Sequence, residues 1–217
     1  CARMHRPEEF AGFDTLSVTT LDLGAALEIG GGTGVIAEGQ TVYASQEALY
    51  VSTNVYIPDN AFEQFPNDMQ VLEQTYETAI HKFDISQPDS AHYLASGAVE
   101  GHIVDQFSMD ESSKGHFRVA TTITRRIPDA QNPSNWWGTL ETTNRLTVLQ
   151  QTNTALTLLG QSEDVAKDER IFSSRFVEDT AYVVTFRQVD PLFTFDLSDP
   201  THPKKVGELK IPGFSSY

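Results

Sequence analysis

The chain has 217 residues, with 30 acidic and 15 basic side chains and a formal net charge of −15 at pH 7. This excess of acid argues against a nucleic-acid partner, because phosphates bind a basic face. No run of the sequence approaches the roughly 20 apolar residues that a helix needs to cross a membrane. The one cysteine, Cys1, cannot form an internal disulfide.

The first expected element is a strand that begins near Leu16, followed by the glycine cluster of residues 30–34. The glycines predict a turn between two structural units. A phosphate-binding loop is disfavoured, because the cluster lacks the lysine of such loops and leads to a predicted strand at Thr41 rather than to a helix. We interpret residues 13–36 as the end of a preceding unit.

A module of four short strands then occurs three times. Its second strand is centred on Tyr50, Phe117 and Tyr182, which are 67 and 65 residues apart. The predicted strands are residues 41–44, 48–51, 81–85 and 93–97 in the first copy, 105–108, 116–119, 146–149 and 156–160 in the second, and 172–177, 181–184, 192–197 and 205–207 in the third. Four strands per repeat is the composition of a β-propeller blade. We therefore predict blades over residues 37–101, 102–168 and 169–213.

Alternation of apolar and polar residues supports the strands. Phe193, Phe195 and Leu197 share one parity, which predicts one buried and one exposed face. The apolar run 181–186 instead predicts a strand covered on both faces, and its Tyr182 is expected to be a core anchor. The predicted fold is an all-β propeller with antiparallel four-stranded blades of about 65 residues in an incomplete ring.

These units are longer than the roughly 40 to 45 residues of a compact four-stranded repeat. The excess lies between the second and third strands, in insertions over residues 55–77 and 124–144. Both insertions are expected on the same rim, where loops usually carry binding sites. A short helix within residues 62–77 is left open.

Four segments carry a resemblance to a known family: residues 77–85, 99–110, 117–122 and 179–214. They are similar to bacterial and archaeal secreted proteins that carry a C-terminal beta-propeller domain. The resemblance implies a propeller, export, and an extracellular or cell-surface location, and it implies no catalytic residue. Three and a half units cannot close a ring of four to eight blades. We therefore expect a piece of a longer protein with further blades, and Cys1 to be a truncation point rather than a lipid anchor.

The candidate polar residues each have two interpretations. Asp22, Asp84 and Asp196 occupy equivalent places, where each either accepts hydrogen bonds from a neighbouring turn or joins a ring of calcium ligands. We favour the turn. His81 and His116 fall inside predicted strands without the spacing of metal ligands, so packed or surface positions are expected. No cofactor is predicted, and calcium is the alternative.

Trp136 and Trp137 are adjacent in the second insertion. Such a pair either tucks against the propeller, which we favour, or forms a stacking platform for a sugar ring or a protein partner. The preferred function is a non-catalytic exported binding or scaffold module that presents rim loops to a protein or a cell-surface polymer. One alternative is an enzyme acting on polysaccharide or phosphate esters, with carboxylates or calcium in the propeller channel. Another is a structural module that positions other domains.

Overall fold

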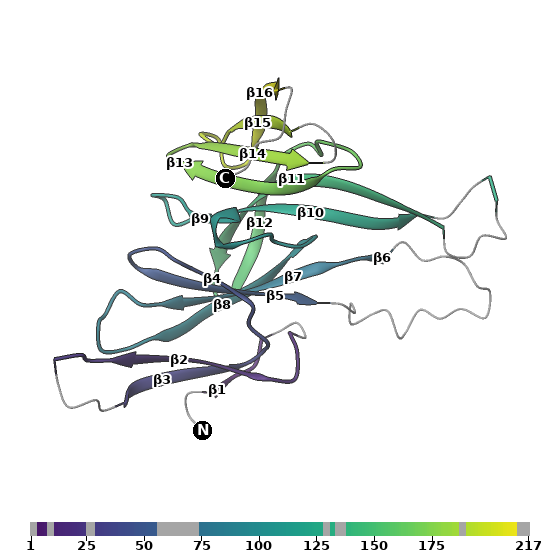
Figure 1. Cartoon of the computed structure of the whole chain (residues 1–217). Helices are drawn as coiled ribbons and strands as arrows, with labels where there is room; N and C mark the ends of the chain where they lie inside the picture. Colours follow the sequence, from purple (N-terminus) through teal and green to yellow (C-terminus); the bar gives the residue numbers. More distant parts are fainter. Residues whose placement is uncertain are drawn as a thin grey trace.

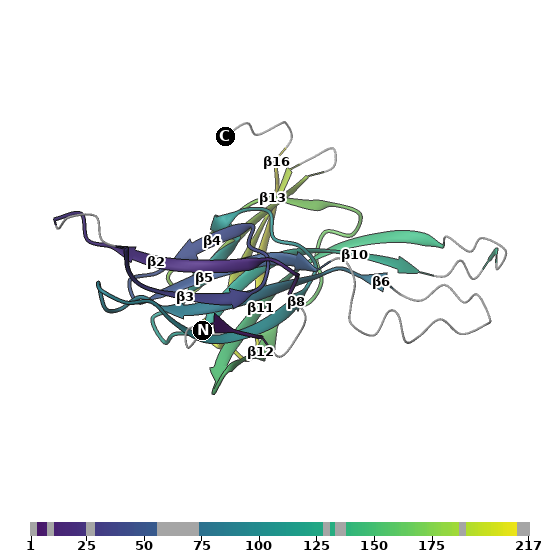
Figure 2. The ribbon, with the colours of Figure 1, turned by 90° about the horizontal axis from the view of Figure 1, so that it is seen from below.

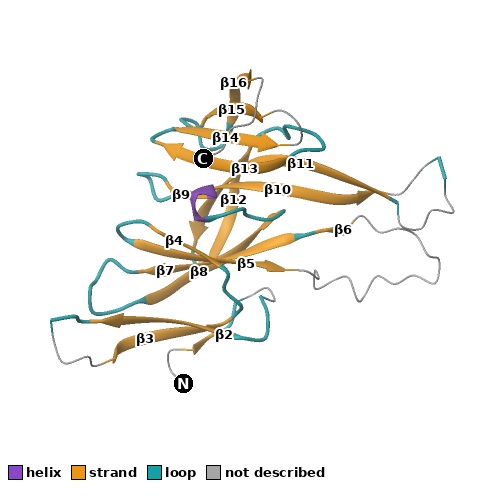
Figure 3. Cartoon of the chain, viewed as in Figure 1, coloured by secondary structure: helices purple, strands orange, loops and turns teal. Residues whose placement is uncertain are grey.

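The computed structural model describes residues 4–7, 11–24, 29–55, 74–127, 131–132, 138–186 and 190–211. Strand is the dominant structure of this part of the chain, and the sheets follow one another in chain order (Figures 1 and 3). The elements are β1 (Met4–His5), β2 (Thr15–Leu21), β3 (Ile29–Ile36), β4 (Thr41–Ala44), β5 (Ala48–Val55), β6 (Gln74–Thr75), β7 (Glu77–Asp84), β8 (His92–Glu100), η2 (Gln106–Ser108), β9 (Met109–Glu111), β10 (Phe117–Ile127), β11 (Thr139–Thr152), β12 (Ala155–Gln161), β13 (Arg170–Val177), β14 (Thr180–Phe186), β15 (Asp190–Asp196) and β16 (Lys204–Ile211).

The strands pair as antiparallel four-stranded sets. One set is β4-β5-β7-β8, the next is β9-β10-β11-β12, and the last is β13-β14-β15-β16. Strands β2 and β3 form a smaller antiparallel pair before them, with β1 beside β3. The predicted all-β fold with four-stranded units is therefore confirmed in the described residues.

Two of the local predictions were wrong. Residues 105–108 were expected to be a strand, but Gln106–Ser108 form the short 3-10 helix η2. Asp105 caps it, because its carboxylate accepts the backbone N–H groups of Phe107 at 2.9 Å and Ser108 at 3.2 Å. The first strand of this unit is β9, which starts at Met109, directly after the predicted range. The glycine cluster 30–34 was expected to be a turn, but it lies within β3, where it pairs with β2.

Glycines in the fourth strands allow adjacent sets to approach closely. The amide of Ser96 in β8 donates to the carbonyl of Thr154 at 3.1 Å, at the one place where β8 meets β12. A Cβ at the neighbouring Gly97 would lie 2.4 Å from the carbonyl oxygen of Leu156. Gly160 in β12 is similarly crowded by a carbonyl oxygen of the last set at 2.4 Å. Any larger residue at either site would force neighbouring strands apart.

The core lies between successive sheets. Tyr50 and Phe117 are buried between the first two full sets, with ring centroids 4.4 Å apart. Between the second and third sets the core contains Val183, Phe193 and Phe195. The prediction that residues 181–186 are covered on both faces was wrong, because Tyr182 is 39% exposed. Ala181 and Val183 lie on the same face as Phe193 and Phe195, and Tyr182 lies on the other face. The predicted parity of Phe193, Phe195 and Leu197 is confirmed.

The second insertion begins later than predicted. Pairing between β10 and β11 continues to Ile127 and Thr139, so residues 124–127 and 139–144 are strand. This hairpin extends from the body of the molecule, and β6 runs along its edge (Figure 2). Several predicted features lie outside the described residues. They are Cys1, Trp136, Trp137 and most of residues 55–77, which includes most of the range left open for a short helix.

Candidate functional site

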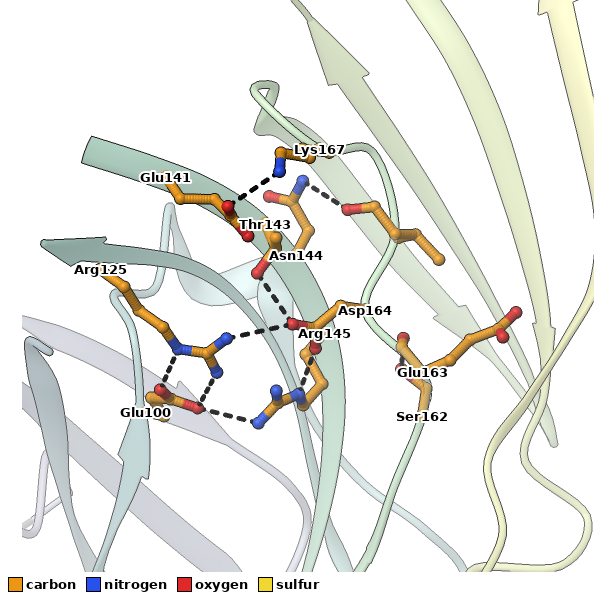
Figure 4. Close-up of polar contacts among 11 residues, drawn as sticks. Glu100, Arg125, Glu141, Thr143, Asn144, Arg145, Ser162, Glu163, Asp164 and Lys167 are labelled. Carbon is orange, nitrogen blue, oxygen red and sulfur yellow. Dashed lines mark hydrogen bonds and ion pairs between the residues drawn. The ribbon is translucent and has the colours of Figure 1, made fainter. Parts of the chain in front are cut away.

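Four charged side chains meet at the base of the β10–β11 hairpin (Figure 4). Glu100 ends β8, Arg125 lies near the end of β10, Arg145 lies on β11, and Asp164 follows β12. We call these four residues the charged ring. It lies at the end of the sheet from which the insertions leave, and it joins three segments that are distant in sequence.

The charged ring is closed by short contacts. Arg125 is bidentate on Glu100, with Nε to Oε1 and Nη2 to Oε2 both at 2.8 Å. Arg145 bridges the two carboxylates, with Nη1 to Glu100 Oε2 at 2.9 Å and Nε to Asp164 Oδ1 at 2.6 Å. Arg125 Nη1 reaches Asp164 Oδ2 at 3.5 Å. Bidentate guanidinium–carboxylate pairs are the strong and geometrically specific ones.

Charge in the ring is balanced. Its side chains are between 15% and 28% exposed, so they are only partly solvated. Burial acts to raise the pKa of Glu100, but the guanidiniums of Arg125 and Arg145 hold it below its usual range. Burial also acts to raise the pKa of Asp164, but the hydrogen bonds from Arg145 and Thr143 and the charges of the two arginines together lower it. Two ionised carboxylates held by two arginines form a brace rather than a proton donor.

A second layer of polar contacts fixes the segment that carries Asp164. Thr143 Oγ1 donates to Asp164 Oδ2 at 3.1 Å, and Lys167 Nζ contacts Glu141 Oε2 at 2.8 Å. Deeper in the sheet, Asn144 is 1% exposed and its amide nitrogen contacts the carbonyl of Glu169 at 3.1 Å. The polar network therefore continues from the partly exposed charged ring into the interior (Figure 4).

The predicted aspartates are confirmed as turn residues. Asp22 Oδ1 accepts the amide of Gly24 at 2.7 Å, and Asp84 Oδ1 accepts that of Ser86 at 2.9 Å. Asp196 Oδ1 accepts the amide of Ser198 at 2.9 Å. All three bonds span two residues, which is the pattern of an Asx turn.

The two strand histidines differ in environment. His81 lies in β7 with no exposed surface, and its Nδ1 is 3.2 Å from the Tyr93 hydroxyl. Burial lowers the pKa of His81 to about 4, so its ring is neutral at pH 7. His116 is half-buried in the turn before β10. Within the described ranges, no three His, Cys, Asp or Glu side chains gather in a way that could hold a metal ion.

Reasoning from the sequence missed the charged ring. Arg125 and Arg145 are two of only 15 basic residues, and they lie at the start and directly after the end of the predicted insertion 124–144, between the second and third predicted strands of one unit. That placement is a signal, because the ends of adjacent antiparallel strands meet.

In the described part of the chain, no helix is long and apolar enough to cross a membrane.

Successive four-stranded sheets with their core between them define a β-propeller type of domain. Comparison with known families agrees: residues 1–217 match the model described as beta propeller domain. The chain belongs to this family.

Two archaeal proteins are similar to the chain. One, an uncharacterised protein of Methanocaldococcus jannaschii, is 36% identical over 163 residues, which cover 73% of this chain and 23% of that protein. The other, an uncharacterised protein of Archaeoglobus fulgidus, is 43% identical over 120 residues, which cover 55% of this chain and 16% of that protein. The chain thus spans less than a quarter of the length of either relative.

Proposed function

We propose that this domain is a non-catalytic binding or scaffold module of a longer exported protein, and that its partner binds the rim from which the β10–β11 hairpin projects. The partner class is a protein or a cell-surface polymer. Export and a surface location rest on the family resemblance.

The observation that carries the proposal is the joint construction of this rim by two adjacent units. Strand β6 belongs to the first insertion, and it pairs with β10 of the next unit through Thr75 and Arg125 and through Gln74 and Arg126. An exposed hairpin stabilised only by its own turn is marginal in water. Here a neighbouring unit supplies an additional strand, so the projecting structure is supported on one edge.

The charged ring supports the same proposal. It holds the hairpin base through Arg125 and Arg145, and it ties this base to the preceding unit through Glu100 and to the segment after β12 of the same unit through Asp164. Loops that bind partners are commonly positioned by a rigid scaffold. The ring gives the rim that rigidity at the place where the hairpin leaves the body.

Binding screens with glycan and cell-wall polymer arrays test this proposal, using the Trp136→Ala/Trp137→Ala variant beside the parent. The connection between β10 and β11 carries this pair, and indoles are frequent stacking surfaces for sugars and partners. A matched control is Phe172→Ala/Phe186→Ala, which removes two partly exposed aromatic rings, 44% and 38% exposed, from another sheet. A stacking platform requires the tryptophan variant to lose binding and the phenylalanine variant to keep it, whereas a pair tucked against the propeller predicts equal binding by both. Equal binding by parent and tryptophan variant would remove the rim tryptophans from the proposal.

A second variant tests the rim without relying on the tryptophans. Glu100→Gln keeps the shape of the side chain but removes the charge that both arginines contact. The hairpin base should loosen, and binding should weaken while the rest of the sheet stays folded. Unchanged affinity, together with measured loosening of the hairpin by amide hydrogen exchange, would mean that the partner binds elsewhere.

A further inference from the structure

A small cavity lies at the opposite end of β10 from the charged ring. Its walls come from the β9–β10 turn, the β13–β14 turn and the segment after β15, and they include Lys114, His116, Arg118, Asp179 and Ser198. The cavity volume is about 10 Å³, which is room for about one water-sized group. Three turns from two successive sheets therefore meet around a space that fits a single oxygen atom.

The turns that form these walls are fixed by hydrogen bonds. In the β9–β10 turn, the amide of His116 donates to the Ser112 hydroxyl at 3.1 Å, and Gly115 takes the positive φ of 76° that the turn requires. The carbonyl of Asp179 accepts the amide of Leu197 at 2.8 Å, which ties the second turn to the third segment. Hydrogen bonds within and between the turns thus hold the walls of the cavity in place.

Arg118 is the buried cation of this site. Its side chain is 6% exposed, and its Nε donates to Asp110 Oδ2 at 2.7 Å while Nη2 pairs with the same carboxylate. The guanidinium also lies over the ring of Phe176, with Cζ 5.7 Å from the ring centroid. Among the described residues Nη1 has no hydrogen-bond partner, and Asp179 Oδ1 stays 3.6 Å away. Because the rest of this guanidinium is held in place, Nη1 can donate a hydrogen bond to a further anionic oxygen.

We propose that this cavity binds an oxyanion, in which one oxygen of a carboxylate or a phosphate ester hydrogen-bonds Arg118 Nη1 and displaces the Asp179 carboxylate. Asp179 can move aside because its side chain is 67% exposed. The rest of the ligand stays in solvent, since the space admits only about one oxygen.

Lys114 contributes the second positive charge at the mouth of the cavity. It is exposed and lies in the same turn as His116. Burial and the nearby Lys114 and Arg118 charges lower the pKa of His116, so its ring is neutral at pH 7 and offers a hydrogen bond rather than a charge. Without Asp179 in place, the charges that line the cavity are Lys114 and Arg118, although the whole chain carries −15.

The experiment is a titration of the whole chain with sodium acetate and, separately, with methyl phosphate, each exchanged for sodium chloride at constant ionic strength. Backbone amide shifts of residues 112–118 and 178–180 report binding, and the two arms separate carboxylate from phosphate chemistry. Saturable shifts in either arm are expected. Shifts that do not saturate in either arm would overturn the proposal.

Two exposed positions give variants that should fold normally. Lys114→Gln should weaken binding about threefold, which corresponds to about 0.65 kcal/mol, because an exposed charge pair contributes only modestly. Asp179→Asn should strengthen binding by a similar factor of about three, because it removes the competing carboxylate. Lys210→Gln is the matched control, since Lys210 is an exposed lysine on β16 and should leave the affinity unchanged. If Asp179→Asn weakens binding, or if the control weakens it as much as Lys114→Gln, the assignment of the site is wrong.

Discussion

Replacing Asn144 with alanine removes an amide that joins three segments of the chain. Its Oδ1 accepts the Thr122 hydroxyl at 2.8 Å, and its Nδ2 lies within 3.1 to 3.3 Å of the carbonyls of Val165, Ala166 and Glu169. Thr122 Oγ1 in turn accepts the amide of Ile171 at 3.0 Å. The side chain thus connects β10 and β11 to the segment that leads into β13.

The magnitude follows from which groups lose their last partner. Val165 O keeps the backbone amide of Asn144 at 3.0 Å, and Ala166 O keeps that of Glu169 at 3.1 Å. The Thr122 hydroxyl proton and the Glu169 carbonyl are the groups that lose the bond shown here. A buried polar group without a partner costs about 1 to 3 kcal/mol, so Asn144→Ala should lower the free energy of unfolding by about 3 kcal/mol.

Urea unfolding measures this change, and Gln151→Ala is the matched control. Gln151 is an exposed amide on the same strand, with one local bond to Asn153 O at 3.1 Å, so its loss should stay within about 0.5 kcal/mol. Thr122→Val completes a double-mutant cycle with Asn144→Ala, and the coupling should be about 1 kcal/mol. A loss below about 1 kcal/mol for Asn144→Ala, or strict additivity in the cycle, would refute the reasoning.

Three further predictions concern packing and pH. Gly97→Ala should cost about 2 kcal/mol because its Cβ would lie 2.4 Å from a carbonyl oxygen, whereas Gly115→Ala, with open space but a φ of 76°, should cost only about 1 kcal/mol in urea unfolding. Tyr50→Ala should cost about 3 to 5 kcal/mol and the partly exposed Tyr182→Ala less than about 1.5 kcal/mol, and equal losses would contradict the register. The folded pKa of His81, about 4, lies below the ordinary 6.5, so stability present above pH 6.5 should fall by about 3 kcal/mol as the pH drops toward 4. The free energy of unfolding of His81→Gln should depend less on pH over the same range. A pH dependence equal to that of the parent would show that His81 is not its cause.

The order of the strands was predictable because the repetition and alternation of apolar residues can be read directly in the sequence. Alternation at Phe193, Phe195 and Leu197 fixed the buried face of β15. Residues directly opposite in an antiparallel pair share a face. Ala181 and Val183 are opposite Phe195 and Phe193, so the buried face of β14 follows from the register. In the run 181–186 almost every residue is apolar, so the sequence alone did not show which face of the strand is buried. For that reason Tyr182 was predicted to lie in the core.

The polar sites were less predictable because they depend on contacts between units. The Asx turns at Asp84 and Asp196 are local, so a short sequence segment contains both donor and acceptor. The charged ring instead brings Glu100 to Arg145, 45 positions away. No sequence period relates these residues, and only the placement of one sheet against the next determines their distance.

The two ends of β10 carry different arrangements of arginine and carboxylate side chains. Apolar faces of the sheets pack against one another in the core, and Arg125 and Arg118 lie near opposite ends of β10. At one end Arg125 contacts two carboxylates and is charge-balanced, which suits a brace for the hairpin. At the other end Arg118 keeps Nη1 without a hydrogen bond and faces an exposed carboxylate that can be displaced. A partner of the rim and a small oxyanion would therefore occupy opposite ends of the same strand, and variants at one end should leave binding at the other unchanged.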